Sequence, residues 1–430
     1  MNAERLTYSA AVEFLYSLRW FGAKFGLETT RRLAALAGCP QEKLRFIHVA
    51  GTNGKGSTCA MLESIYRAAG LRVGLFTSPH LVSFRERIQV NRRLIPETEV
   101  VRLVQELRAA NQANDATLFE FATVMALKYF AEQKCDLVIW ETGLGGRLDA
   151  TNIVTPLASV ITNIAFDHTQ WLGDTLAKIA AEKAGIIKPG IPVVTATDAP
   201  AALAVIEEIA REKNAPLIIV AAKEIESRLA GTFAPPLLGQ HQKNNAALAL
   251  ATVGILQKQI PVSAENIRAG LATVNWPGRL QLVQKPNGQK ILLDGAHNVA
   301  GAETLRAALE KHFAGIRPVI IFGALQDKQW PHICRLLAPL ATEIFTVPVV
   351  SERTAEAGEL ANCFRAANPA VPVTALQNLP AAINASKDKP FIVITGSLYL
   401  VGEALERLGF SPATGGERGL NEWSAPQIAR

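Results

Sequence analysis

Features typical of secreted, zinc-binding and membrane proteins are scarce in this chain of 430 residues. Its cysteines are few, odd in number and scattered, and no two of them form a C-x-x-C pair. Such a set argues against a disulfide framework and a structural zinc site, and it favours a reducing, cytoplasmic setting. The five are Cys39, Cys59, Cys135, Cys334 and Cys363.

Long apolar runs and blocks of positive charge are also missing. No run reaches the ~18 residues of a membrane-spanning helix. The start of the chain, MNAERLTYSAAVEF, has charges where a signal peptide would need an unbroken apolar segment. The net charge of +6 is spread along the chain without a Lys/Arg block. We therefore expect no membrane partner and no nucleic acid, whereas a mild positive surplus suits acidic small molecules.

Apolar side chains are plentiful, at 49% of residues, which excludes disorder for most of the chain. Short apolar segments alternate with amphipathic helical patterns, which predicts an α/β fold with parallel sheets. The expected strands are Leu44–Val49, Arg72–Phe76, Asp136–Trp140, Ala158–Asn163, Pro192–Thr195, Pro216–Val220, Ile291–Leu293, Val319–Phe322, Glu343–Val347 and Phe391–Thr395. The expected helices include Ser57–Ala69, Glu97–Asn111, Phe119–Glu132, Thr175–Ile187, Asn244–Leu256, Ala300–Phe313 and Ala381–Lys387.

The clearest break in this pattern is the segment Trp276–Arg279, which contains proline and glycine. Pro286–Gly288 follows it and reads as a hairpin turn. We therefore expect one domain over residues 1–280 and a smaller one over 281–410. Residues 411–430 are polar and rich in glycine, and we expect a flexible tail there.

The strongest motif is a glycine-rich turn, GTNGKGST, between an expected strand and an expected helix. Its glycines allow backbone N–H groups to surround a phosphate, the helix N-terminus adds its dipole, and Lys55 adds a charge. The literal Walker pattern fails, because Val49 stands at its first glycine position and Gly56 separates Lys55 from Ser57. The context nevertheless predicts phosphate binding rather than a merely structural turn.

Polar residues follow three other strands at the edge where open α/β sheets bind ligands. Ser78 follows the second strand, Glu141 the third and His168 the fourth. Glu141 and Ser78 suit Mg²⁺, which prefers oxygen ligands and keeps waters and substrate phosphates. His168 is a less usual ligand, and a hydrogen-bonded loop histidine remains an alternative for it.

Lys183 occupies one position of the apolar stripe in the helix Thr175–Ile187. A buried lysine has a lowered pKa, and its neutral amine can react with CO₂ to give a carbamate that presents oxygens to a metal. A stem lying over the apolar face is the alternative. In the second domain, Asp294 and His297 end a strand, and a helix-capping turn is the alternative to a binding role there.

Several of these segments together resemble one family. GTNGKGST, SPHLVSFRERIQVN (78–91), ETGLGGRLDATN (141–152), the segment 162–193, WPGRL, DGAHN and ITGSLYL are similar to the folylpolyglutamate synthase/dihydrofolate synthase family of the Mur ligase superfamily. The resemblance covers residues 21–410. It implies an N-terminal P-loop NTPase-like domain and a C-terminal Rossmann-like domain, with the active site between them. It also implies that ATP activates a carboxylate as an acyl phosphate, which L-glutamate then attacks.

The resemblance assigns roles residue by residue. It implies two Mg²⁺ ions, one held by Ser78 and Glu141 and one by His168, with Lys183 as a metal-binding carbamate and Lys55 as a catalytic cation. We also expect K⁺ or another monovalent cation as a cofactor, and a monomer. The implied ATP-binding residues are Thr52, Asn53, Gly54, Lys55, Gly56, Ser57, Asn245, Arg279, Asp294 and His297. Those implied for dihydropteroate or a reduced folate are Thr117, Leu118, Phe119, Glu120, Leu148, Asp149 and Ala150.

Other functions stay open from the sequence. A cell-wall Mur ligase would share much of the pattern, and the family also contains enzymes that only extend folates. A P-loop kinase or nucleotide switch would use the same loop without an amine substrate. An ATPase stimulated by nucleic acid would rest on the net charge alone, and it would show salt-sensitive DNA binding. The segment Leu118–Phe121 favours the bifunctional kind of enzyme.

Overall fold

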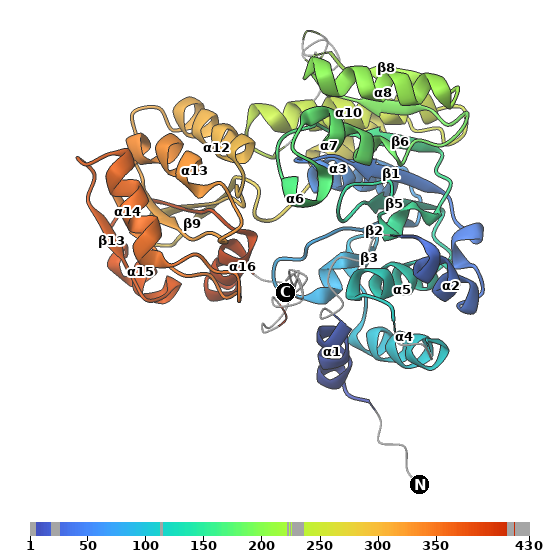
Figure 1. Ribbon diagram of the computed structural model, residues 1–430, viewed down its shortest axis with the longest axis horizontal. Coiled ribbons are helices and arrows are strands. Elements are labelled where there is room, and N and C mark those ends of the chain that lie inside the picture. Colours follow the sequence, from blue (N-terminus) through green and yellow to red (C-terminus); the bar gives the residue numbers. More distant parts are fainter. Residues whose placement is uncertain are drawn as a thin grey trace.

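The chain folds around two separate β-sheets, which form two lobes (Figure 1). The computed structural model describes residues 6–18, 26–111, 115–221, 223, 225, 236–410 and 417. The first sheet has eight strands and the second has six. Each sheet carries helices on its faces, so the expected α/β fold with a large parallel sheet and a smaller second one is confirmed.

The first sheet has the order β4-β3-β2-β5-β1-β6-β7-β8 and is parallel from β2 to β8, while β3 and β4 pair antiparallel at one edge. Its strands are β1 (Phe46–Ala50), β2 (Val73–Phe76), β3 (Ile88–Val90), β4 (Arg93–Leu94), β5 (Leu137–Glu141), β6 (Ala158–Ile161), β7 (Val193–Thr195) and β8 (Leu217–Ile219). The helices of this lobe are α1 (Tyr8–Ser17), α2 (Glu28–Leu36), α3 (Lys55–Ala68), α4 (Glu97–Ala110), α5 (Leu118–Glu132), α6 (Thr169–Leu172), α7 (Leu176–Ala184), α8 (Pro200–Glu212), α10 (Gln240–Leu256) and α11 (Ala264–Ala272).

Alternate residues of the central strands enter different cores, because successive side chains of a strand point to opposite faces. In β1, Phe46 packs in the core beneath α1, α4 and α5, whereas Ile47 and Val49 pack in the core beneath α3 and α10. In β5, Trp140 packs in the first of these cores and Ile139 in the second. All positions of both strands are buried. This double burial explains the continuously apolar runs in the sequence.

The second sheet has the order β13-β12-β11-β14-β10-β9, parallel except for β9 against β10. The expected hairpin turn at Pro286–Gly288 is confirmed, since it joins this antiparallel pair and the Gly288 N–H donates to the Lys285 carbonyl. The strands are β9 (Gln281–Gln284), β10 (Lys290–Leu293), β11 (Val319–Phe322), β12 (Glu343–Thr346), β13 (Val373–Ala375) and β14 (Phe391–Thr395). The helices are α12 (Val299–His312), α13 (Trp330–Leu337), α14 (Ala357–Ala367), α15 (Leu379–Ala385) and α16 (Leu398–Arg407).

All ten expected strands are present, with ends displaced by at most two residues. The short strands β3, β4, β9 and β13 lay outside the expectation, since they have two to four residues each. Most of the expected tail 411–430 lies outside the described residues. Glu417 is described, however, and it is buried and hydrogen-bonded rather than loosely held.

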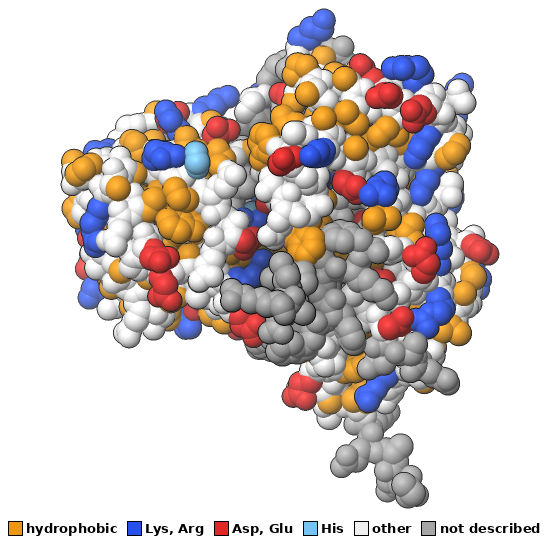
Figure 2. Space-filling view, in the orientation of Figure 1, with side chains coloured by type: hydrophobic (Ala, Val, Ile, Leu, Met, Phe, Trp, Pro, Cys, Tyr) orange, Lys and Arg blue, Asp and Glu red, His pale blue; other side chains and the backbone are white. Residues whose placement is uncertain are grey.

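Two further observations concern the charge on the surface and the apolarity of the helices. On the face shown in Figure 2, acidic and basic side chains are interspersed over both lobes. Over the described part of the chain, no helix combines the length and apolarity needed to cross a bilayer.

Candidate active site

A cavity of about 510 Å³ lies between the two lobes, at the carboxyl ends of the central strands. Every site residue expected from the sequence lines it. They come from the phosphate loop and the start of α3, from the segments that follow β2, β5, β6 and β10, from α5, α7 and α10, and from the connection before β9. Residues far apart in the sequence meet here: beside the cavity, Asn53 is hydrogen-bonded to Asn298, which lies 245 residues later. The individual roles of the expected site residues remain predictions.

The phosphate loop joins β1 to α3 and needs glycine for two different close approaches. Gly51 has φ +147°, and a Cβ there would lie 1.8 Å from Thr162 Oγ1. Gly54 has φ +84°, and its Cβ would lie 2.5 Å from Asn245 Oδ1. Lys55 Nζ donates to the Gly51 carbonyl at 3.1 Å and to the Thr52 carbonyl at 3.3 Å. The lysine ammonium is thus held across the loop, where a phosphate would enter.

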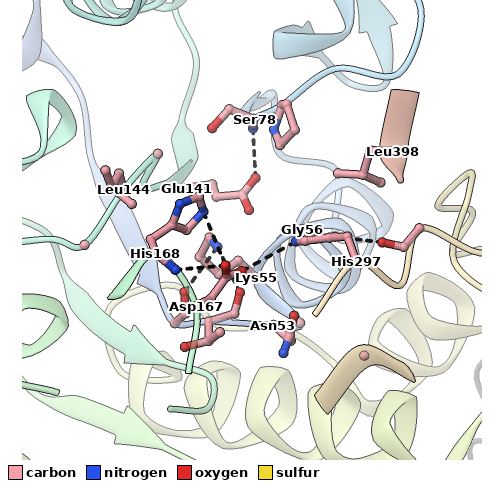
Figure 3. Close-up of a pocket in the computed structure, with 18 of the residues that line it drawn as sticks. Asn53, Lys55, Gly56, Ser78, Glu141, Leu144, Asp167, His168, His297 and Leu398 are labelled. Carbon is pink, nitrogen blue, oxygen red and sulfur yellow. Dashed lines mark hydrogen bonds and ion pairs between the residues drawn. The ribbon is translucent and has the colours of Figure 1, made fainter. Parts of the chain in front are cut away.

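Glu141 is a buried carboxylate at the end of β5, only 4% exposed. Its Oε2 accepts the Ser78 N–H at 3.0 Å (Figure 3). Burial raises the pKa of Glu141 to about 7, although the nearby charge of Lys55 opposes the rise. A cation beside this carboxylate would remove the cost of its burial, so the residue fits a divalent metal.

The rest of the donor set also fits Mg²⁺ better than a metal held by protein alone. Within the described ranges, no group of three or more His, Cys, Asp or Glu side chains could hold a metal ion. Mg²⁺ does not require such a cage, because it binds through one or two carboxylates together with waters and substrate phosphates. Burial lowers the pKa of His168 to about 4, so its imidazole is neutral and able to act as a ligand.

Lys183 is buried on α7 as its place in the apolar stripe predicts, with 4% exposure. Its Nζ donates to the Gly51 carbonyl at 2.9 Å, so Lys183 and Lys55 share one acceptor. Burial first, and then the charge of Lys55, lower the pKa of Lys183 to about 7. A large share of this amine is therefore neutral near neutral pH, as a reaction with CO₂ requires.

Asp167 joins the two lobes, which the sequence did not predict. Its carboxylate accepts from Lys328 Nζ at 2.8 Å and from Asn298 Nδ2 at 3.1 Å, both in the second lobe. Asn298 also donates to Asn53 of the phosphate loop at 3.1 Å. Burial acts to raise the pKa of Asp167, but hydrogen bonding from His297 and the charge of Lys328 hold it well below its usual range. Figure 3 shows Asp167 beside His168 and Lys55.

Replacing Lys328 with alanine is expected to weaken closure of the two lobes. Both side chains of the Lys328–Asp167 pair are 9% exposed, and removing one partner of a buried pair leaves an uncompensated charge. Opening the cleft hydrates that charge, so we expect a larger radius of gyration by X-ray scattering and a fall in kcat/KM of about 10- to 100-fold. Lys311→Ala, an exposed lysine of α12, is the control. Unchanged scattering with unchanged kinetics would contradict a closing role.

In the expected pterin region, two carboxylates shape the wall as well as line it. Glu120 forms a capping box on α5, with its Oε2 accepting the Thr117 N–H at 2.8 Å. Asp149 Oδ2 accepts the N–H groups of Gly143 and Leu144, which fixes the glycine-rich turn after β5. Phe119 lies against Gly143, where a Cβ would come within 2.5 Å of the ring. Glycine at 143 therefore leaves room for the phenyl ring.

In the second lobe, Asp294 lines the cavity and also stabilises a turn, the role given above as the alternative to binding. Asp294 accepts the N–H groups of Leu280 at 2.8 Å and Ala296 at 3.0 Å. The N-cap of α12 is Asn298, not Asp294 or His297. Burial raises the pKa of Asp294 and lowers that of Arg279, and each charge offsets the other. The pair thus ties the connection between the lobes to the end of β10.

Four lining or supporting residues were missed from the sequence: Asp167 as a contact between the lobes, Lys328, Arg87 and Gln242. Arg87 lines the cavity at 4% exposure, and Gln242 Nε2 donates to Ser57 Oγ at 3.3 Å. Arg87 stands in the segment 78–91 quoted above, and Gln242 precedes the expected ATP-binding residue Asn245 by three positions. Lys328 follows β11 without a glycine-rich turn, and its partner lies 161 residues away.

Comparison with known proteins agrees with this geometry. The family described as Mur ligase middle domain matches residues 49–253, and that described as Mur ligase, glutamate ligase domain matches residues 278–398. The dihydrofolate synthase/folylpolyglutamate synthase of Bacillus subtilis is 38% identical over 427 residues, which span 93% of this chain and 99% of that protein. The Escherichia coli protein of the same name is 33% identical over 407 residues, spanning 92% and 94%.

Solved structures give the same answer. Escherichia coli FolC in complex with DHPP and ADP superposes with a TM-score of 0.83 at 31% identity, covering 94% of this chain and 98% of that one. The Mycobacterium tuberculosis folylpolyglutamate synthase complexed with ADP and AMPPCP gives a TM-score of 0.85 at 30% identity, covering 94% and 100%. The chain therefore belongs to the folylpolyglutamate synthase/dihydrofolate synthase family of the Mur ligase superfamily, whose members are ATP-dependent acid–amino-acid ligases.

Proposed function

We propose that this ligase joins L-glutamate both to dihydropteroate and to the γ-carboxylate of folates. In each case ATP transfers its γ-phosphoryl group to the substrate carboxylate, and the amino group of glutamate then displaces phosphate to form the amide. One observation carries the proposal. One cavity is lined by the phosphate loop, by Glu141 and by the apolar side chains of Leu118, Phe119 and Leu148.

The residues of the chain supply positioning and charge, which are the main needs of phosphoryl transfer. Lys55 and the loop amides bind the phosphates, and Arg279, Asp294, His297 and Asn245 would hold the rest of the nucleotide. Ser78 and Glu141 would bind one Mg²⁺, with His168 and a carbamate on Lys183 serving the second. The metal would neutralise charge that develops on the transferring phosphoryl group. Closure of the lobes excludes the water that would hydrolyse an acyl phosphate.

The proposal extends to the cellular compartment, the oligomeric state and a monovalent cation. The free cysteines of the described chain are compatible with a reducing compartment, so we place the enzyme in the cytoplasm. We further propose that it works as a monomer, since the cavity is built from the two lobes of one chain. A monovalent cation such as K⁺ remains part of the proposal.

Phe119→Ala is expected to weaken binding of the pterin substrate and to leave binding of ATP almost unchanged. The ring lines the cavity and contacts the glycine-rich turn, so its loss removes an apolar surface for a pterin. We expect KM for dihydropteroate to rise about 10-fold or more, while KM for ATP changes less than about twofold. Phe313→Ala, in the second lobe, is a matched loss of a phenyl ring away from the cavity. Equal KM changes for both substrates would contradict the assignment of this end.

The decisive experiment measures phosphate release with dihydropteroate and with tetrahydrofolate side by side, each with and without L-glutamate. A bifunctional enzyme releases phosphate and forms a glutamyl product with both. Release with tetrahydrofolate alone would reduce the function to folate extension. A stable phosphorylated product without a glutamyl adduct would indicate a kinase. Failure with both substrates would reopen a cell-wall Mur ligase activity.

A further inference from the structure

Glu417, near the C-terminus, is fastened to the loop that forms one wall of the cavity. This loop, residues 78–87, contributes Ser78, Pro79 and Arg87 to the lining. It comes from the first lobe, more than 300 residues before Glu417 in the sequence. Glu417 is nevertheless only 9% exposed. A residue beyond the second lobe therefore returns to the first lobe and packs beside the active site.

One carboxylate oxygen of Glu417 accepts three hydrogen bonds. Its Oε2 accepts from the Tyr8 hydroxyl at 3.0 Å, from the Ser83 hydroxyl at 3.0 Å and from the Phe84 N–H at 2.7 Å. Tyr8 begins α1, whereas Ser83 and Phe84 stand at the start of the short 3₁₀ helix within the loop. Hydrogen bonds to an ionised group are stronger than neutral ones. This carboxylate therefore links three parts of the chain at one point.

The backbone of Glu417 makes a second link that reaches the cavity. Its carbonyl oxygen lies 3.0 Å from His80 Nε2, and Arg87 Nε donates to His80 Nδ1 at 2.9 Å. A carbonyl only accepts and a guanidinium N–H only donates, so His80 must carry its proton on Nε2. Burial holds the pKa of His80 well below its usual range, which agrees with a neutral ring. Two successive hydrogen bonds thus connect Glu417 through His80 to Arg87, which lines the cavity.

The loop has a separate carboxylate for its internal shape. Glu86 accepts the N–H groups of Leu81, Val82 and Ser83 at 2.8 to 2.9 Å. All of these partners lie within five residues of Glu86. Glu86 therefore folds the loop on itself, whereas Glu417 fixes the folded loop relative to α1. The two carboxylates can be tested independently, because they bind different amides.

We propose that Glu417 is a positioning residue of this ligase, which holds the loop 78–87 against the cavity and thereby positions Arg87 in the lining that it shares with Glu141. The inference rests on the proposed function for its kinetic consequences. Its structural consequence, fixation of the loop, is independent of the substrate.

The test compares Glu417→Ala, Glu417→Gln and Glu208→Ala, the last being an exposed glutamate of α8. For Glu417→Ala we expect KM for dihydropteroate or tetrahydrofolate to rise about 10-fold, with KM for ATP within about twofold of wild type. Glu417→Gln keeps an acceptor oxygen and should recover most of the loss. Glu208→Ala should match wild type. Hydrogen exchange at the Phe84 amide should accelerate at least about 10-fold in Glu417→Ala, whereas the amides bound to Glu86 should stay protected.

Each outcome decides the matter. Unchanged KM and unchanged exchange at Phe84 in Glu417→Ala would overturn the proposal. So would a parallel rise of KM for ATP and the pterin substrate with a lower melting temperature, because that pattern indicates general destabilisation. If wild-type protein releases no glutamate-dependent phosphate with either substrate, the proposed function fails instead. Exchange at Phe84 then decides by itself whether Glu417 fixes the loop.

Discussion

Lys55→Ala is expected to lower kcat about 10²- to 10³-fold while the protein remains folded. Lys55 supplies the only lysine charge of the phosphate loop itself, and its Nζ lies against the loop carbonyls of Gly51 and Thr52. Removal of one preorganised group that stabilises transition-state charge costs about 10²- to 10³-fold. The substitution should also weaken ATP binding, because the same ammonium would contact the phosphates of bound ATP before the reaction. Steady-state phosphate release and ATP affinity measure the two effects separately.

Structural damage from this substitution should be small. Lys55 is the first residue of α3, and alanine is a strong helix former. Circular dichroism and the melting temperature should therefore match wild type. Lys258→Ala, which removes an exposed lysine far from the loop, is the matched control and should keep full activity. Retention of more than about a tenth of wild-type kcat by Lys55→Ala would contradict the catalytic role.

Lys183→Met is expected to lower kcat at least about 10²-fold without a loss of thermal stability. Methionine keeps an unbranched apolar stem in the buried stripe, so packing is preserved. The sign of the stability effect follows from the pKa, which falls from an ordinary value of 10.5 to about 7 on folding. Folding is therefore penalised below about pH 10.5, and the full penalty is present below about pH 7. Removing the amine removes this cost of burying a protonated group. The gain in folding free energy offsets the loss of the hydrogen bond from Lys183 to the Gly51 carbonyl.

The loss of rate follows if Lys183 carries a carbamate. The neutral Nζ attacks the carbon of CO₂, an N–C bond forms, and one proton leaves the nitrogen to solvent. We expect kcat to fall at least about 10²-fold in Lys183→Met at saturating Mg²⁺ and ATP. Wild-type activity in CO₂-free buffer should also fall and should return with bicarbonate. Lys178→Ala, an exposed lysine of the same helix, should behave as wild type.

The pH dependence gives an independent check. Below about pH 7 the Lys183 amine is mostly protonated and cannot react, so carbamate content should decrease as pH falls. Carbon NMR with isotopically labelled bicarbonate would detect the modification directly. Wild-type rates in Lys183→Met, or no labelled carbamate at any pH, would show that this lysine only fills the stripe.

The sequence predicted the parts of the site that follow strand ends. Glu141 and His168 could be found because apolar strands are easy to recognise and their carboxyl ends meet at one edge. Lys183 could be found because a lysine interrupts a helical stripe. Asp167 was visible next to His168, but its partner Lys328 was not, since no local pattern specifies a contact between two sheets. Glu417 was hidden for the same reason, and its polar, glycine-rich surroundings suggested a tail.

The bonds from Asp167 to Lys328 and Asn298 also affect how nucleotide affinity should be interpreted. Each lobe has its own hydrophobic core, so each can keep its structure while the cleft opens. A nucleotide that contacts both lobes binds only the closed population, and its apparent Kd equals the intrinsic Kd divided by the closed fraction. A substitution that only opens the lobes can therefore weaken ATP binding. By reciprocity, saturating nucleotide should restore closure in a variant that lacks the bond.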